Sequence, residues 1–116
     1  MIKHKSLDLR YMETMAAGDQ ETMNALLTSL RQELSNNRGV ARRLYQNAQW
    51  SELERFCHHF KSTLSFSGNT QLINANLQLW DMAKNSGGNT AMADTVLREL
   101  EQRCQAVVRE LNQMLK

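Results

Sequence analysis

The most constraining feature of this sequence is a helical repeat of apolar residues that no proline interrupts along 116 residues. Proline commonly ends helices and marks loops, so its absence leaves glycine and asparagine as the main punctuation. Strand signals are missing too, because no stretch alternates apolar and polar residues with a period of two. The sequence therefore predicts an all-α protein.

Length, composition and charge bound the class of protein. A chain of this size suits one core, so we expect residues 1–116 to form a single domain. The composition, 41% hydrophobic and 22% charged, is that of an ordinary globular protein. Fourteen Lys and Arg against twelve Asp and Glu give a charge of +2. So small a charge argues against a nucleic-acid binder that depends mainly on phosphate contacts.

The sequence also indicates a compartment. No apolar run approaches the roughly 20 residues of a membrane span, and the basic start at Met1–Ser6 lacks the apolar core of a secretory signal. We therefore expect a cytoplasmic protein without membrane insertion. Cys57 and Cys104 lie on apolar helical stripes and outside any Cys-x-x-Cys pair. They are expected to be small buried hydrophobes and not a zinc site, and the alternative of a disulfide between them has no positive support in the sequence.

Glycine and asparagine divide the first half of the chain. A short helix is expected from about Ser6 to Ala17, after which Gly18-Asp19 suits a helix end followed by a cap. The apolar seam of the next helix continues to Gln46 if the chain stays helical through residues 36–39, although Asn36–Gly39 is also the obvious place for a break. The seam begins with Met23, Leu26, Leu27, Leu30 and Leu34.

Three further helices are expected. Ser51 and Glu54 have the spacing of a capping box, which would open the first of them. Gly68-Asn69 ends that helix, the following one stops before Gly87-Gly88, and Asn89 or Thr90 caps the last. Helices of this length with short connections predict an antiparallel four-helix bundle with a short additional N-terminal helix. The apolar stripe of the helix after Gly68 is expected to be Leu72, Ile73, Leu77, Trp80 and Ala83.

The one cluster that suggests chemistry surrounds the adjacent His58 and His59. Neighbouring residues on a helix are about 100° apart, so these two do not form the i,i+4 pair that grips a metal. His58 lies about 150° from the centre of the apolar stripe of its helix and should face solvent. That stripe consists of Leu53, Phe56, Cys57, Phe60 and Leu64. The face around His58 carries Glu54, Lys61, Ser62 and Ser65.

Such a face suits a phosphoryl carrier. A neutral imidazole is nucleophilic near pH 7, Lys61 can neutralise the charge of a phosphoryl group, and the small Ser62 leaves room for a partner protein. An exposed histidine beside lysine and serine is, however, more often an ordinary solvated helix face.

The string Cys57–Ser62, followed by Gly68, resembles the signature of histidine-containing phosphotransfer (HPt) domains. In that family a small residue precedes the phosphorylated histidine. An apolar residue, a lysine, a small residue and a glycine follow it at plus two, three, four and ten. Counting selects His58, not His59, as the acceptor, and the matching residues are Cys57, Phe60, Lys61, Ser62 and Gly68.

The resemblance extends along most of the chain. Gly18-Asp19 and the apolar residues after it look like the family's first bundle helix. Asn47–Trp50 stands where the family turns into the active helix, and Leu79–Lys84 looks like the apolar–acidic segment of the following helix. Ser67 departs from the apolar residue often found at plus nine, with Phe66 one place early. That departure leaves the packing at the end of the active helix open.

The resemblance implies a phosphorelay intermediate. His58 would accept a phosphoryl group from the aspartate of a response-regulator receiver domain and pass it to another receiver, and a hybrid sensor kinase is a further implied partner. Lys61 would stabilise charge, Ser62 would be the small neighbour, and Gly68 would form the turn after the active helix. The receiver carries the Mg²⁺, so no cofactor is expected on this chain.

The chain is expected to be a carrier and not an autonomous ATP-dependent kinase, because it has no glycine-rich nucleotide-binding motif. The competing function is an HPt-like interaction module, an adaptor or kinase inhibitor without phosphotransfer. His58, Lys61 and Gly68 in one register favour the carrier. A bundle that buries its stripes internally fits a monomer, and the starting methionine without a linker favours a free-standing protein.

Several side chains are candidates for docking a receiver: Glu54, Arg55, His59, Ser65 and Phe66. Glu54 is a candidate to orient the ring of His58, although a simple acid at the helix start is the favoured interpretation. Phe66 lies about 130° off the buried stripe and contacts either the receiver or the N-terminal helix. Arg38, Arg42 and Arg43 form a basic cluster, for which solvated surface is favoured over partner steering.

Overall fold

The computed structural model describes residues 6–115, so residues 1–5 of the basic start, with His4 among them, lie outside the described residues. Within that range the chain is helical and contains no strand, as the sequence predicts. None of its helices is long and apolar enough to cross a membrane. The helices are α1 (Arg10–Ala16), α2 (Gln20–Asn36), α3 (Val40–Gln46), α4 (Trp50–Ser67), α5 (Thr70–Lys84) and α6 (Thr90–Met114).

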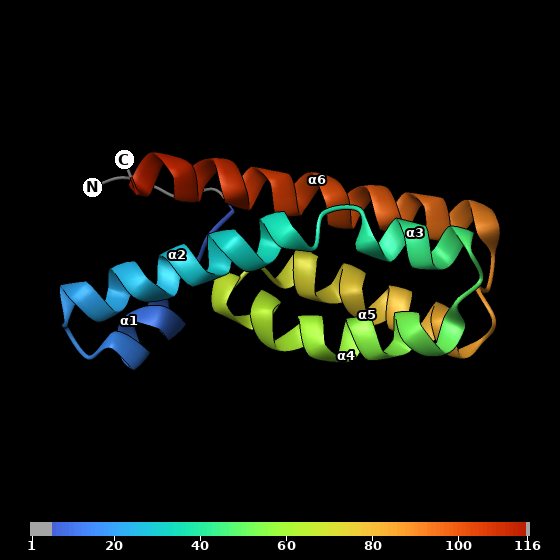
Figure 1. The fold of residues 1–116 in the computed structure, drawn as a ribbon, viewed down its shortest axis with the longest axis horizontal. Coiled ribbons are helices and arrows are strands. Elements are labelled where there is room, and N and C mark those ends of the chain that lie inside the picture. The colour runs from blue at the N-terminus through green and yellow to red at the C-terminus, as the bar shows by residue number, and fades with distance from the viewer. Residues whose placement is uncertain (1–5, 116) are drawn as a thin grey trace.

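The long helices lie side by side along the longest axis of a molecule that measures 44 × 21 × 20 Å (Figure 1). α4 and α5 form a tight hairpin, α6 packs against α5 and α2, and α3 lies beside α4. Every helix contributes apolar side chains to the shared core. Burial of each large one stabilises the fold by roughly 1.5–3 kcal/mol. The fully buried leucines are Leu53, Leu64, Leu72, Leu79, Leu97 and Leu111.

The segment between residues 36 and 40 breaks the long seam into two helices. α2 stops where the side-chain amide of Asn37 donates to the carbonyl of Glu33, at 2.7 Å. Gly39 then adopts a left-handed φ of 77°, which glycine reaches without steric cost, and α3 starts at Val40. Ala41 and Leu44 of the predicted seam are nevertheless buried. A single helix as far as Gln46 is therefore wrong, and the break is confirmed.

The capping box predicted at Ser51 is also wrong. α4 begins two residues earlier than a cap at Ser51 implies, at Trp50, with Gln49 in the cap position and no side-chain cap. The ring of Trp50 lies 5.1 Å from that of Tyr45, and its edge is so close to Gly87 that a Cβ there would be 2.6 Å away. A side-chain cap contributes about 1 kcal/mol, and an edge-to-face aromatic pair contributes about as much beyond its burial.

The N-termini of α2, α5 and α6 each have an asparagine or an aspartate in the cap position. Asn69 and Asn89 cap α5 and α6, since their side chains accept hydrogen bonds from the backbone amides three residues later. Asp19 occupies the cap position of α2, but its carboxylate accepts from the hydroxyl of Thr22 and not from a backbone amide. The predicted caps Asp19 and Asn89 are therefore correct in position, and Asn89 also makes the expected bond, whereas the cap at Asn69 was not predicted.

The first helix is shorter than predicted, because residues 6–8 form a non-helical strap over the end of the molecule. The Asp8 amide donates to the carbonyl of Ser67 at 2.9 Å, and the Ser6 amide donates to the Glu110 carboxylate at 3.1 Å. The side-chain amide of Asn69 donates to the carbonyl of Ser6 at 3.0 Å. Backbone groups engaged in these bonds are not available to a helix, so α1 starts only at Arg10.

α5 buries a different stripe from the predicted one. It contacts both α4 and α6, so its buried arc includes Ala75, Asn76, Leu79 and Met82, whereas Leu77 is 41% exposed. Leu72 and Ala83 are buried as predicted. The other three predicted residues share a second face of the helix, at spacings of four and seven, and Lys84 continues this face at a spacing of eleven. We call this second face the outer stripe of α5, and it consists of Ile73, Leu77, Trp80 and Lys84.

Candidate functional site

His58 projects from the middle of α4, and its side chain is exposed, as the helical wheel predicts. On the opposite side of the same helix Leu53, Cys57 and Leu64 are fully buried. His59 is exposed as well, and its ring centre lies 5.6 Å from that of His58. The helix is thus held by its apolar side while the imidazole of His58 stays exposed to solvent.

Two residues of the outer stripe of α5 stand beside His58, and the sequence did not single out either as a site residue. The ring of Trp80 meets the ring of His58 edge to face, with centres 5.2 Å apart and planes at 68°. The ammonium of Lys84, one turn further along, lies 4.9 Å from the centre of the Trp80 ring, within the range of a cation–π contact. The sequence signal for them is weak, because Trp80 has the spacing of a core residue.

A buried hydrogen bond joins α4 to α5 next to the histidine. Asn76 is 1% exposed, and its side-chain amide donates to the backbone carbonyl of Cys57 at 2.9 Å. The side-chain oxygen of Asn76 has no partner within the described residues. The bond sets the position of α5 along α4 one residue before His58, which places Trp80 against the imidazole.

Lys61, Ser62 and Ser65 follow His58 on the same side of α4, since residues three, four and seven apart share a helix face. Lys61 and Ser62 are exposed, and the Ser65 hydroxyl donates to the carbonyl of Lys61 at 2.9 Å. The face that the sequence predicts around His58 is therefore present. Lys61 thus follows His58 by one turn of α4, and Lys84 of α5 lies over the Trp80 ring that meets the imidazole.

Gly68 ends α4 in the left-handed conformation, with φ 64°, and its amide donates to the carbonyl of Ser65. A Cβ at this position would lie 2.5 Å from the carbonyl oxygen of Asp8 in the strap. Glycine is thus required twice, by the backbone conformation and by the close approach of another segment. The predicted role of Gly68 in the turn after this helix agrees with its position.

Ser67, the departure from the apolar residue expected there, is fully buried with its hydrogen bonds satisfied. Its hydroxyl donates to the carbonyl of Leu64 and accepts from the amide of Asn69 at 3.1 Å. Its own carbonyl accepts the bond from Asp8 in the strap. The end of α4 is therefore well packed around a polar residue.

The proposed docking residues differ in their surroundings. Arg55 and His59 are exposed, whereas Glu54 is half-buried and makes no hydrogen bond to His58 within residues 6–115. Phe66 is half-buried, and the ring of Tyr11 from α1 packs edge-on against it with centres 5.5 Å apart. Of the two contacts predicted for Phe66, the one with the N-terminal helix is present.

The predicted basic cluster is divided among different surroundings. Arg42 donates to both carboxylate oxygens of Glu101, at 2.9 and 2.8 Å, and to Asp94 at 3.1 Å. These carboxylates raise the pKa of its guanidinium above the ordinary value. Solvated surface is therefore the wrong description of Arg42, because two acids of α6 face it. Arg38 and Arg43 are both exposed, as solvated surface predicts, and Arg38 also lines a cleft.

The two cysteines are free thiols, Cys57 fully buried and Cys104 half-buried. Burial raises the pKa of both to about 12, so each stays protonated at neutral pH and behaves as a hydrophobe. Within residues 6–115 no three His, Cys, Asp or Glu side chains gather as a metal site would require.

The side chain of His58 is exposed on the surface of α4. Neither of two clefts, of about 470 and 350 Å³, is lined by His58. No family model, curated protein or solved structure matches the chain.

Proposed function

We propose that this protein is an HPt-type phosphoryl carrier in which His58 accepts a phosphoryl group from the aspartate of a receiver domain and passes it to another receiver. The helices would form the antiparallel four-helix bundle of that family. In that bundle, α2 and α3 together would count as the first helix, and α4, α5 and α6 would be the other three. α1 would be the additional N-terminal helix. The family resemblance of the sequence motif is one support for this proposal.

The observation that carries the proposal is the setting of His58. It is an exposed imidazole on a helix that is buried on its other side, with Lys61 one turn away and Trp80 against its ring. A nucleophile that must reach a partner's active site needs this combination of access and rigid support. An ordinary solvated histidine needs neither an aromatic neighbour nor a second cation held over that neighbour.

The transfer would proceed by in-line displacement at phosphorus. A ring nitrogen of neutral His58 donates its lone pair to the phosphorus of the receiver's aspartyl phosphate. The bond between phosphorus and the aspartyl oxygen breaks, and the carboxylate leaves with that electron pair. Lys61 and Lys84 stabilise the negative charge on the three outer phosphoryl oxygens, as cations do in phosphoryl transfer generally. The Mg²⁺ belongs to the receiver and not to this chain.

The proposed partner docks over α4 and the outer stripe of α5. Leu77 is 41% exposed and lies one turn from Trp80, so the surface beside His58 offers apolar contact as well as charge. Exposed apolar residues next to a charged centre are typical of protein–protein contact surfaces. In this proposal a hybrid sensor kinase or free receiver supplies the phosphoryl group, and the protein works as a cytoplasmic monomer.

Transfer from a phosphorylated receiver to this chain tests the proposal. Wild type is compared with His58→Gln and His59→Gln, and the product is checked for the acid lability and alkali stability of phosphohistidine. Label on wild type and His59→Gln, with none on His58→Gln, is the expected result. His59 is a matched control, because it is also exposed on the same helix.

Two other results would overturn parts of the proposal. Loss of label only in His59→Gln would move the acceptor to the neighbouring residue. Absence of label with a panel of receivers that each phosphorylate a known HPt protein would favour the interaction module, because receiver docking would then serve no transfer. A pull-down of the same receivers would separate that module from a protein that does not bind receivers at all.

A further inference from the structure

A cleft opens where α2 breaks into α3, on the side of the molecule away from His58. It has a volume of about 470 Å³, within the range of ligand pockets of roughly 300–1,000 Å³. Phe56 and Phe60 of α4 line it, and each lies about 160° around the helix from His58. The cleft therefore belongs to a different surface from the proposed phosphoryl site.

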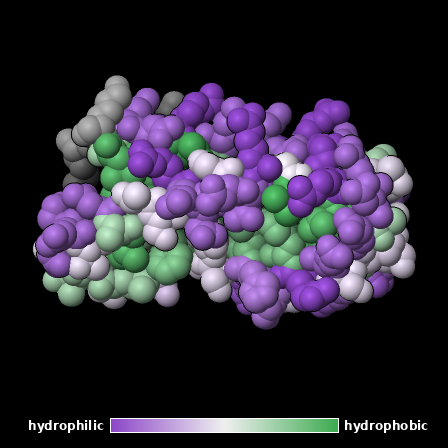
Figure 2. All heavy atoms as spheres, in the orientation of Figure 1, coloured by the Kyte–Doolittle hydropathy of each residue, from purple (hydrophilic) through white to green (hydrophobic). Residues whose placement is uncertain are grey.

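The walls of the cleft are largely apolar. The rings of Phe56 and Phe60 stack with centres 4.9 Å apart and planes at 29°, and Leu100 and Val108 of α6 face them. Gly39 stands at the break with no side chain, and a Cβ built there would meet nothing within 4 Å. Figure 2 shows hydrophobic atoms at the surface near this break, bordered by hydrophilic ones. The helix break thus leaves an apolar hollow instead of a filled helix face.

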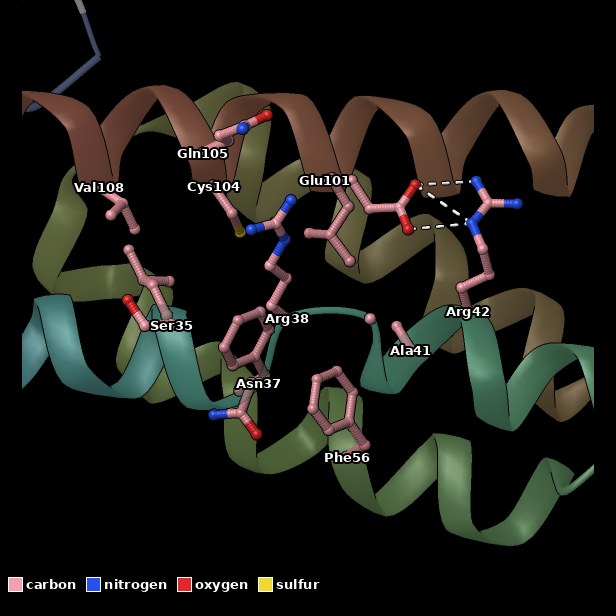
Figure 3. Close-up of a pocket in the computed structure, with 14 residues that line it drawn as sticks. Ser35, Asn37, Arg38, Ala41, Arg42, Phe56, Glu101, Cys104, Gln105 and Val108 are labelled. Carbon is pink, nitrogen blue, oxygen red and sulfur yellow. Dashed lines mark hydrogen bonds and ion pairs between the residues drawn. The ribbon is translucent and has the colours of Figure 1, made fainter.

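The charges around the cleft do not cancel. Arg42 is held by Glu101 and Asp94, and Asp94 also pairs with Arg98, so these four residues form a neutral network. Arg38 makes no ion pair within the described residues, which leaves the cleft with one uncompensated positive charge. Figure 3 shows the Arg38 side chain extending from the α2–α3 break across the cleft towards α6, while Arg42 is turned to Glu101.

We propose that this cleft binds a small amphipathic carboxylate, whose apolar body packs on the Phe56–Phe60 wall and whose carboxylate pairs with Arg38. A guanidinium presents a planar set of donors that suits a carboxylate. Cys104 faces the same space as a neutral thiol and adds no competing negative charge. The proposal does not depend on phosphotransfer, because no residue near His58 takes part.

A series of straight-chain carboxylates tests the site. Hexanoate and octanoate are titrated into the full chain, and backbone amide shifts are followed by NMR. Octanoate should bind about 15-fold more tightly than hexanoate, since each buried methylene contributes about 0.8 kcal/mol. The shifts should concentrate at the α2–α3 break and on the facing turns of α4 and α6. Octylamine, with the opposite charge, should bind at least about tenfold more weakly than octanoate.

Three variants sharpen the test. Arg38→Gln should weaken octanoate binding by about tenfold or more, because a hydrogen-bonded charge pair is lost. Arg43→Gln, an exposed arginine on the neighbouring turn, should leave it unchanged. Ser35→Trp should fill the cleft from its exposed rim and abolish binding while the helical circular dichroism is retained.

The proposal is overturned by any of three results. Equal affinity of Arg38→Gln and wild type would remove the carboxylate contact, and equal affinity for octylamine would reduce the site to a non-selective apolar patch. Shifts at the same residues that appear on concentrating the protein alone would show that a second copy of the chain fills the cleft. The titration involves no phosphoryl group, so its failure would leave the proposed function untouched.

Discussion

The side-chain amide of Asn76 donates a hydrogen bond to the backbone carbonyl of Cys57, the residue that precedes His58, across 2.9 Å. A helix carbonyl has two lone pairs and can accept this bond beside its helical one. The other polar atom of Asn76, its side-chain oxygen, is buried without a partner in the described part of the chain. This contact thus aligns α5 with α4 at the candidate site. Its cost is the desolvation of the Asn76 side-chain oxygen, which has lost water without gaining a partner.

Substitutions of Asn76 should change the free energy of unfolding according to which of its two side-chain polar groups they remove. Asn76→Asp loses the donor and places a carboxylate against a carbonyl oxygen, so we expect it to destabilise the protein by more than about 3 kcal/mol. Asn76→Leu removes the buried oxygen together with the donor and should stay within about 1 kcal/mol of wild type. Urea unfolding measures both. A leucine variant as unstable as the aspartate variant would contradict this account.

Lys61 and Lys84 should contribute unequally to the rate of phosphoryl transfer. Lys61→Ala is expected to lower the rate of phosphoryl transfer by about tenfold to a hundredfold, because a charge near the phosphoryl oxygens is lost. Lys84→Ala should lower it by less, about threefold to tenfold, since its ammonium is shared with the Trp80 ring. Rapid-quench transfer assays measure these rates. Lys84→Arg should keep most of the activity, and a rate as low as that of Lys84→Ala would contradict a role for the charge.

Comparing Gly68 with Gly18 separates the cost of a left-handed backbone from the cost of a clash with the strap. Both have a left-handed φ, but a Cβ on Gly18 would meet nothing within 4 Å, whereas one on Gly68 would strike Asp8. Gly18→Ala should therefore cost only about 1–2 kcal/mol for its backbone conformation. Gly68→Ala should cost about 1–3 kcal/mol more, because the strap must move. Thermal unfolding of the two variants tests this. Equal losses of stability would mean that the strap moves away from a Cβ at residue 68 without a cost in free energy.

The buried thiols should make the fold sensitive to alkali. Their pKa rises from 9.0 in the unfolded chain to about 12 in the folded protein. Between these values the unfolded chain has lost protons that the folded protein keeps. The contribution to stability is therefore intact below pH 9 and is lost as the pH rises towards 12. The fully buried Cys57 alone should give a slope of about 1.4 kcal/mol per pH unit, and the half-exposed Cys104 less.

The ultraviolet absorbance of thiolate measures this directly. In the folded protein it should appear only near pH 12, and in guanidinium-unfolded protein near pH 9. Cys104→Ser serves as the control, because it should leave the later transition of Cys57 in place. Thiolate absorbance at pH 9 in folded Cys104→Ser would show that Cys57 is accessible to solvent.

The helical class and the exposure of His58 could be predicted because each depends on local spacing. Apolar residues at three–four intervals identify the buried side of α4, and a residue opposite them must face solvent. Asn37 and Gly39 indicate the break before α3, but the spacing of apolar residues does not distinguish a break from a continuous helix. Ala41 and Leu44 continue the same apolar seam in both cases. The left-handed φ of Gly39 settles it.

The rest depends on neighbours that spacing does not reveal. The sequence makes Leu77 a core residue and omits Leu79, because which arc of α5 is buried depends on its simultaneous contact with α4 and α6. The same shift places Trp80 against His58 and not inside the core. The strap is hidden for a similar reason, because Ser6 and Asp8 find their hydrogen-bond partners in distant segments.

The strap and the α4–α5 hairpin differ in how far along the chain their contacts reach. Ser6 and Glu110 are 104 positions apart, whereas Cys57 and Asn76 are only 19 apart. Closing a longer loop costs more chain entropy, so during folding the hairpin should assemble early and the strap last. In the native ensemble the reverse order makes the strap the first part to detach. The surface around His58 would then persist in molecules whose N-terminal segment has already come away.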